Sequence, residues 1–143
     1  MQNRGIVIAL FGLVAVAGVF MMVGPRASEG DQEAAVKVAV DAYVRAFAKG
    51  DGQTACRLLS DSARDAVAGM AARIGATDCP SAMKRTREIG GSQVRAIARK
   101  IRVGKIDVKG STARVTLRAA GQDSVAELER VGKDWKISSL PQA

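Results

Sequence analysis

Residues 5–24 form a continuous stretch without a charged side chain, and this stretch constrains the chain more than any other feature. A short polar start that contains Arg4 precedes it. Twenty helical residues, at a rise of about 1.5 Å each, extend roughly 30 Å, which is the thickness of the hydrocarbon core of a bilayer. The sequence therefore predicts a transmembrane anchor at residues 1–27 and an extracytoplasmic domain at residues 28–143.

A cleaved secretory signal peptide is the alternative interpretation of the same stretch. The apolar run is longer than the core of about 7–15 residues that signal peptides use, and residues 23–28 contain no A-x-A cleavage site. No cysteine follows the run directly, which excludes a lipid-modified N-terminus. Arg4 lies before the span and Arg26 after it, so the charge bias is weak. We expect a single-pass protein of the cell membrane, or a secreted protein if cleavage occurs.

Cys56 and Cys79 are the two cysteines of the sequence. Outside the cytoplasm disulfides form and persist, and the spacing is far wider than the C-x-x-C of redox motifs. We interpret the pair as a structural disulfide that stabilises the fold by roughly 3 kcal/mol. Two unpaired buried thiols are the alternative.

The composition excludes several kinds of chemistry. The chain has no histidine, which excludes Ser-His-Asp and Cys-His catalysis and nearly all catalytic zinc sites. Two cysteines do not suffice for a four-cysteine metal site. We therefore predict no metal, no cofactor and no catalytic residue.

The first half of the domain has helical periodicity. Over residues 31–48 the apolar side chains recur at steps of three and four, as in Val36, Val40, Tyr43 and Phe47. Further helices are predicted at residues 53–59 and 63–74, and a short fourth helix opens after Asp78 and ends near residue 89. Gly50 and Gly75 suit helix ends, and Asp51 and Asp78 suit N-caps.

After Gly90 and Gly91 the pattern alternates as in β-strands. Strands are predicted around residues 100–109, 112–117, 124–131 and 135–137, with a β-bulge at Gly104 and Lys105. Helices followed by antiparallel strands indicate an α+β domain, with three to four helices packed on a curved antiparallel sheet.

Two segments carry a resemblance to a known superfamily. Residues 39–51 (AVDAYVRAFAKGD) resemble the first helix of nuclear transport factor two-like proteins, and residues 128–137 (LERVGKDWKI) resemble their last hairpin. This superfamily has a cystatin-like α+β cone and includes ketosteroid isomerase and polyketide cyclase-like proteins. The resemblance covers roughly residues 31–140 and is structural in character.

The resemblance implies an apolar cavity between helices and sheet. Its expected wall residues are Tyr43, Phe47, Trp135 and Glu127. Glu127 is in phase with Val125 and Val131, which favours an inward carboxylate, but Ala126 and Leu128 form a rival apolar face that would leave Glu127 in solvent. Tyr43 and Trp135 also suit the core.

Positive charge is concentrated in residues 84–118, which hold eleven Lys and Arg residues against Glu88 and Asp107. Such a segment suits an anionic lipid, a wall polymer or an acidic protein partner, although outward Lys and Arg also protect the edges of ordinary sheets. Nucleic acid is not expected, because the segment lacks aromatic residues for stacking on bases. The expected face comprises Lys100, Arg102, Lys105 and Lys109.

Three functions follow from these features. The first is a membrane-tethered, non-enzymatic domain that binds a partner protein or a small apolar ligand at the cell envelope. The second is an isomerase or dehydratase with Glu127 or Asp107 as base and Tyr43 as donor. The third is a structural envelope component that acts as a homodimer.

Overall fold

The computed structural model describes residues 27–141, so the predicted anchor segment at residues 5–24 lies outside the described residues. The described chain is α+β, as predicted. No helix within it is long and apolar enough to span a bilayer. Its helices are α2 (Glu29–Lys49), α3 (Gly52–Arg57), α4 (Asp61–Ala71), the 3₁₀ helix η1 (Ala72–Ile74) and α5 (Cys79–Lys100). Its strands are β1 (Arg102–Lys109), β2 (Thr112–Ala119), β3 (Gln122–Val131) and β4 (Asp134–Ser139).

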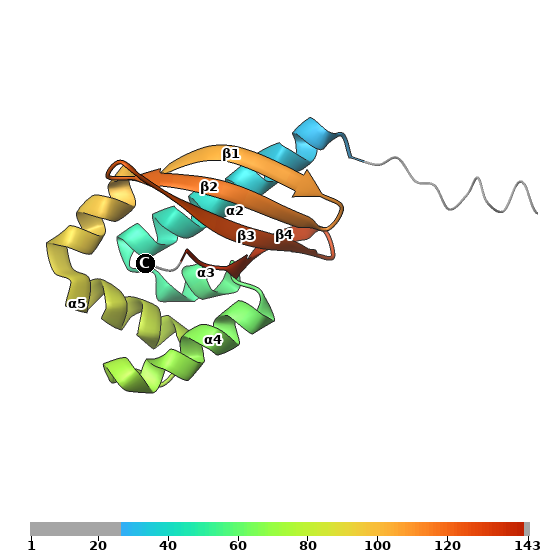
Figure 1. Cartoon of the computed structure of the whole chain (residues 1–143). Coiled ribbons are helices and arrows are strands. Elements are labelled where there is room, and N and C mark those ends of the chain that lie inside the picture. Colours follow the sequence, from blue (N-terminus) through green and yellow to red (C-terminus); the bar gives the residue numbers. More distant parts are fainter. Residues whose placement is uncertain (1–26, 142–143) are drawn as a thin grey trace, which may run out of the picture.

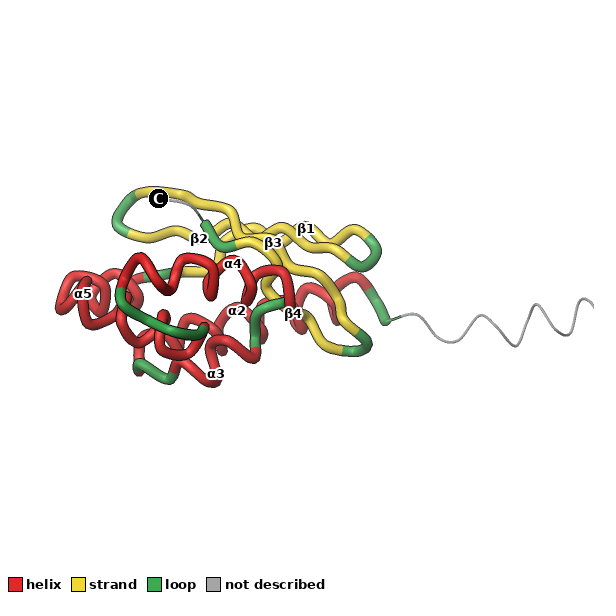
Figure 2. The backbone as a smooth tube through the Cα atoms, turned by 90° about the horizontal axis from the view of Figure 1, so that it is seen from below, coloured by secondary structure: helices red, strands yellow, loops and turns green. Residues whose placement is uncertain are grey.

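The helices and the sheet form two layers. The four strands are antiparallel and follow the order β1-β2-β3-β4, so each strand pairs with its neighbour in sequence. All the helices lie on one side of the sheet (Figure 2). Helix α2 runs beneath the strands, and α5 curves around one end of the domain to reach β1 (Figure 1).

Side-chain caps begin the helices at the positions that the sequence predicts. The Asp51 carboxylate accepts a hydrogen bond from the Thr54 backbone N–H at 3.0 Å. Hydrogen bonds from the Thr54 side chain and backbone lower the pKa of Asp51. Asp78 caps α5 in the same way, accepting from the Ser81 N–H at 2.8 Å. Gly50 ends α2 with a φ of 77°, which a residue without Cβ adopts freely.

Helix α5 is longer than predicted. We expected it to end near residue 89, with strand structure after the glycine pair, but it continues to Lys100. Gly91 has a φ of 53° and a ψ of −137°, so the backbone breaks there and a second helical segment follows. Beyond the break, Val94, Ile97 and Ala98 resume helical spacing, and Ala98 is buried. The glycine pair therefore bends the helix instead of ending it.

The bulge in the first strand and the alternation in the second strand agree with the predictions. A shift between Val103 and Ile106 marks the bulge. Ala113, Val115 and Leu117 alternate toward the helices and are buried. The turns at Gly110 and Gly132 lie where they were predicted, whereas β3 begins at Gln122, two residues before the predicted start. Because side chains alternate along each strand, the inner face of the sheet is apolar and buried and the outer face is exposed.

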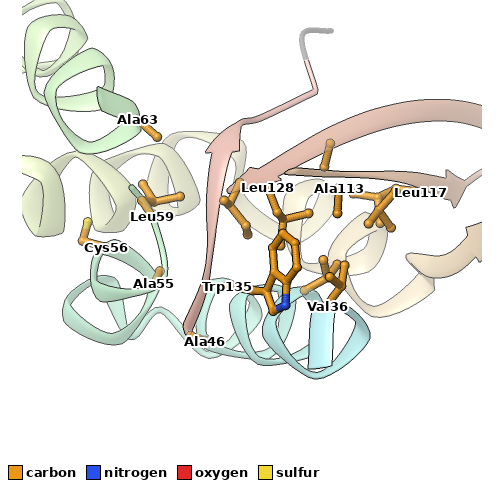
Figure 3. Packing of buried hydrophobic residues seen from close by; sticks show 14 of the residues in the cluster. Val36, Ala46, Ala55, Cys56, Leu59, Ala63, Ala113, Leu117, Leu128 and Trp135 are labelled. Atoms are coloured by element: carbon orange, nitrogen blue, oxygen red, sulfur yellow. The ribbon is translucent and has the colours of Figure 1, made fainter. Parts of the chain in front are cut away.

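The core fills the space between this apolar face and the helices. Trp135 reaches from β4 toward Val36 of α2, with Leu128 beside it (Figure 3). All three side chains are at least nine-tenths buried. The interpretation of Trp135 as a core residue is thus confirmed.

A disulfide joins Cys56 of α3 to Cys79 at the start of α5, as predicted. The backbones of α3 and α5 approach each other closely here. A Cβ on Gly52 would lie only 2.4 Å from the carbonyl oxygen of Pro80. Gly52 permits this close approach, and the disulfide holds the short helix α3 against α5.

Candidate functional site

An apolar pocket of about 290 Å³ lies between α2, the second segment of α5 and the inner face of the sheet. Its helical wall consists of Val40, Tyr43, Val44, Phe47, Ile97 and Ile101. Its sheet wall consists of Leu117, Ala119, Ser124, Ala126 and Ile137, and Leu140 and Pro141 lie beside it. The volume is just below the range of about 300–1,000 Å³ that is typical of small-molecule sites.

The pocket exists because large and small side chains face each other. Helix α2 presents apolar residues at steps of three and four. Across from them the strands carry the small side chains of Ala119, Ser124 and Ala126, which leave space below the sheet. The bend at Gly91 brings Ile97 over the remaining opening. Ile97 keeps 48% of its surface exposed, so it lies at the rim.

Two hydroxyl groups supply the polar atoms of the pocket side chains. The Tyr43 hydroxyl donates to the sulfur of Met83 at 3.8 Å. Burial raises the pKa of Tyr43 to about 12, so the phenol is neutral at physiological pH. The Ser124 hydroxyl donates to the Leu117 carbonyl at 3.4 Å. None of the residues that line the pocket within the described chain carries a charge. The lining is therefore apolar apart from these two neutral hydroxyls, and it suits an apolar ligand.

Tyr43 and Phe47 line the pocket, as expected, and their rings stack with centroids 6.4 Å apart. Trp135 does not line it. The indole is buried in the neighbouring core, where it packs toward Val36, so its assignment to the pocket wall is wrong. The sequence prediction does not include Ile97, because a glycine pair usually ends a helix, although the four-residue spacing from Ile97 to Ile101 is helical.

Glu127 also lies elsewhere, on the solvent face of the sheet. Its carboxylate pairs with Arg114 of β2 at 3.3 Å. Val125 is 45% exposed whereas Ala126 is 2% exposed, so Ala126 and its neighbour Leu128 form the inner face. Of the two interpretations, the one with Glu127 in solvent is correct, and its assignment to the pocket wall is wrong.

Asp107, the other carboxylate considered as a base, lies on the same solvent face. It is opposite Arg114 in the strand register and is 3.9 Å from the ammonium of Lys109. Neither carboxylate reaches the pocket, and both are paired with cations.

The predicted cationic face is altered in two ways. Lys100 ends α5 and does not belong to a strand, whereas Arg102, Lys105 and Lys109 are exposed on β1. Several cations of the sheet are paired with acids, as in the 2.7 Å contact between Arg118 and Asp123. The solvent face of the sheet is therefore mixed in charge, which favours the ordinary role of outward cations. The anionic partner stays a prediction.

We found no protein family, curated protein or solved structure with significant similarity to this chain. The resemblance to nuclear transport factor two-like proteins thus stays a prediction, and the pocket has to be interpreted from its own residues.

Proposed function

We propose that this protein is a membrane-tethered extracytoplasmic domain that binds a small apolar ligand in the pocket beneath its sheet, without catalysing a reaction on it. The observation that carries the proposal is the pocket wall, which combines aliphatic and aromatic side chains with two neutral hydroxyls. Such concave, mostly apolar sites with a few polar groups are typical of ligand-binding proteins.

The absence of a base at this site favours binding over the isomerase alternative. A general base has to lie within hydrogen-bonding reach of the proton that it abstracts. Glu127 and Asp107 lie on the opposite face of the sheet, where each has a cationic neighbour. Helices that cover one face of the sheet over an apolar pocket also suit our proposed assignment to the nuclear transport factor two-like superfamily.

Two features support the proposed location. Residues 5–24 have the length and composition of a membrane anchor. The disulfide between Cys56 and Cys79 is of a kind that persists in oxidising compartments.

Photochemical labelling tests the pocket. The full-length chain in phosphatidylcholine nanodiscs is incubated with a neutral diazirine-bearing alkyl alcohol, irradiated, and the labelled residues are located by mass spectrometry. We expect adducts on the segments around Tyr43 and Ile97 that saturate with probe concentration. Ala119→Phe places a phenyl group in the pocket, so that two or more probe methylenes lose their burial. At ~0.8 kcal/mol each, this weakens labelling about tenfold.

Ala96→Phe is the matched control, because Ala96 is exposed on α5 and does not line the pocket. It should label like the wild type. Circular dichroism of both variants verifies that they fold. Labelling spread evenly over the surface, or equally strong in folded Ala119→Phe, would exclude the pocket as a binding site.

A further inference from the structure

A second hollow of about 280 Å³ adjoins the apolar pocket, between α2, the end of α5 and β1. The two share Val44 and Ile101 as lining residues, so these side chains lie where the two hollows meet. Unlike the pocket, the second hollow contains charged side chains, namely Asp41, Arg45 and Arg99.

The charges of this hollow do not cancel. The Asp41 carboxylate is paired with Lys37, one turn away on α2. Neither Arg45 nor Arg99 forms an ion pair with any residue from 27 to 141. Both arginines are exposed and come from different elements, α2 and α5, so they flank the hollow from two sides. Two unpaired guanidinium groups next to one opening favour a ligand with a negative charge.

An apolar pocket beside a hollow with two arginines favours a ligand that has an apolar tail and an anionic head group. We propose that the ligand is a single-chain carboxylate amphiphile, whose alkyl tail fills the apolar pocket while its carboxylate passes Val44 and Ile101 to reach Arg45 and Arg99. This inference rests on the proposed function and names its ligand class. Tyr43 and Ser124, which are neutral, then contact the tail region and do not compete for the anion.

The test compares two probes that differ only in the head group. Diazirine-bearing decanoic acid and the corresponding decanol label the full-length chain in phosphatidylcholine nanodiscs, and the half-saturating concentration is measured for each. Arg45→Gln/Arg99→Gln should raise the value for the acid about fivefold, since exposed ion pairs contribute modestly. The value for the alcohol should not change, because the pocket wall is intact. High salt should reduce the difference between wild type and variant.

Arg73→Gln is the matched control, since Arg73 lies on η1 and lines neither hollow. It should leave both probes unaffected. Labelling by decanol also reports that each variant is folded. If the double variant changes neither probe, or both equally, the carboxylate assignment is wrong and the apolar pocket stands. If neither probe labels the pocket of the wild type, the proposed function is wrong as well.

Discussion

Tyr43 combines an apolar surrounding with a weak hydrogen bond. Its ring lines the pocket beside Phe47, and its hydroxyl donates to the sulfur of Met83 at 3.8 Å. Sulfur is a weak acceptor, and no carboxylate or amine is among the residues that line the pocket in residues 27–141. Burial is therefore the cause of the raised pKa, and the charged form of the phenol is strongly disfavoured in the folded state.

This raised pKa predicts a loss of stability at high pH. The pKa is about 12 in the folded state and near 10 in the unfolded state, so the unfolded chain releases the proton first. The stabilisation by the neutral phenol is complete below pH 10 and disappears as the pH rises to about 12. The free energy of unfolding should fall by about 2–3 kcal/mol over this range. Urea unfolding followed by the fluorescence of Trp135, the one tryptophan in the sequence, measures it.

Tyr43→Phe is the control for this prediction. The variant retains the ring and cannot ionise, so its stability should fall less over the same pH range, while the titration of lysines affects both proteins alike. Tyr43 is also the one tyrosine of the sequence, so the ultraviolet absorbance of tyrosinate reports its pKa directly. A midpoint near 10 in the folded protein would contradict the buried, neutral phenol.

At the scale of elements, the bend in α5 shapes the pocket. A straight helix from Cys79 would continue away from the sheet, whereas the break at Gly91 turns the second segment back toward β1 (Figure 1). Ile97 then reaches the rim of the pocket, and Arg99 reaches the adjoining hollow. The geometry of both sites thus depends on one backbone conformation that residues with a Cβ rarely adopt.

Two glycine substitutions should have opposite effects on stability. Gly91→Ala forces an alanine into a φ of 53°, so we expect a loss of about 1–3 kcal/mol even though no atom obstructs the new Cβ. Gly69→Ala lies within the regular helix α4, where the Cβ also meets open space, and should stabilise the protein by about 0.5–1 kcal/mol. Urea unfolding curves of the two variants measure both. If both variants changed the free energy of unfolding by the same amount, Gly91 would not have the positive φ in the folded protein.

At the scale of the whole molecule, long-range links join the helical half to the sheet. The segment between α3 and α4 pairs with β4, since Ser60 N–H donates to Ile137 O at 2.8 Å and Ile137 N–H donates to Leu58 O at 2.9 Å. This bridge pairs the backbone groups of Ile137 at the outer edge of β4, which would otherwise lack a partner there. The disulfide holds α3 against α5 on the other side of the same region.

Removing the disulfide should weaken the fold without changing the pocket. Cys56→Ser/Cys79→Ser should lower the free energy of unfolding by about 3 kcal/mol, because the unfolded chain regains the conformational freedom of the loop. Neither cysteine lines the apolar pocket, so labelling by the alcohol probe should persist at temperatures where the variant is folded. Simultaneous loss of labelling in a folded variant would contradict the separation of the two regions.

The same cysteines report the compartment. In protein taken from cells with thiols blocked at once, Cys56 and Cys79 should be unreactive until a reductant is added. Free thiols in freshly prepared wild-type protein would contradict the proposed extracytoplasmic location.

The sequence alone determined those features of the fold that depend on a few neighbouring residues. The caps at Asp51 and Asp78, the end of α2 at Gly50, the bulge after Val103 and the alternation in β2 all depend on a few neighbouring residues. The disulfide was predictable because the sequence contains two cysteines, which follow an uncharged apolar stretch of twenty residues. Tyr43 and Phe47 were predictable as pocket residues because helical spacing and the superfamily resemblance agreed.

The tertiary structure decided the features that depend on contacts between distant segments. By its local preference alone, a glycine pair can either end a helix or bend it. Here the bend is selected because Ala98 and Ile97 pack against the rest of the domain. Glu127 had two alternating patterns around it, and burial of Ala126 and Leu128 against the helices chose between them. Trp135 and the pocket both lie on the inner face of the sheet. The small side chains of Ala119 and Ser124 create the pocket where they face the large side chains of α2, and only the tertiary structure brings these residues together. These features depend on which surfaces of distant segments pack together, and a short window of sequence does not contain this information.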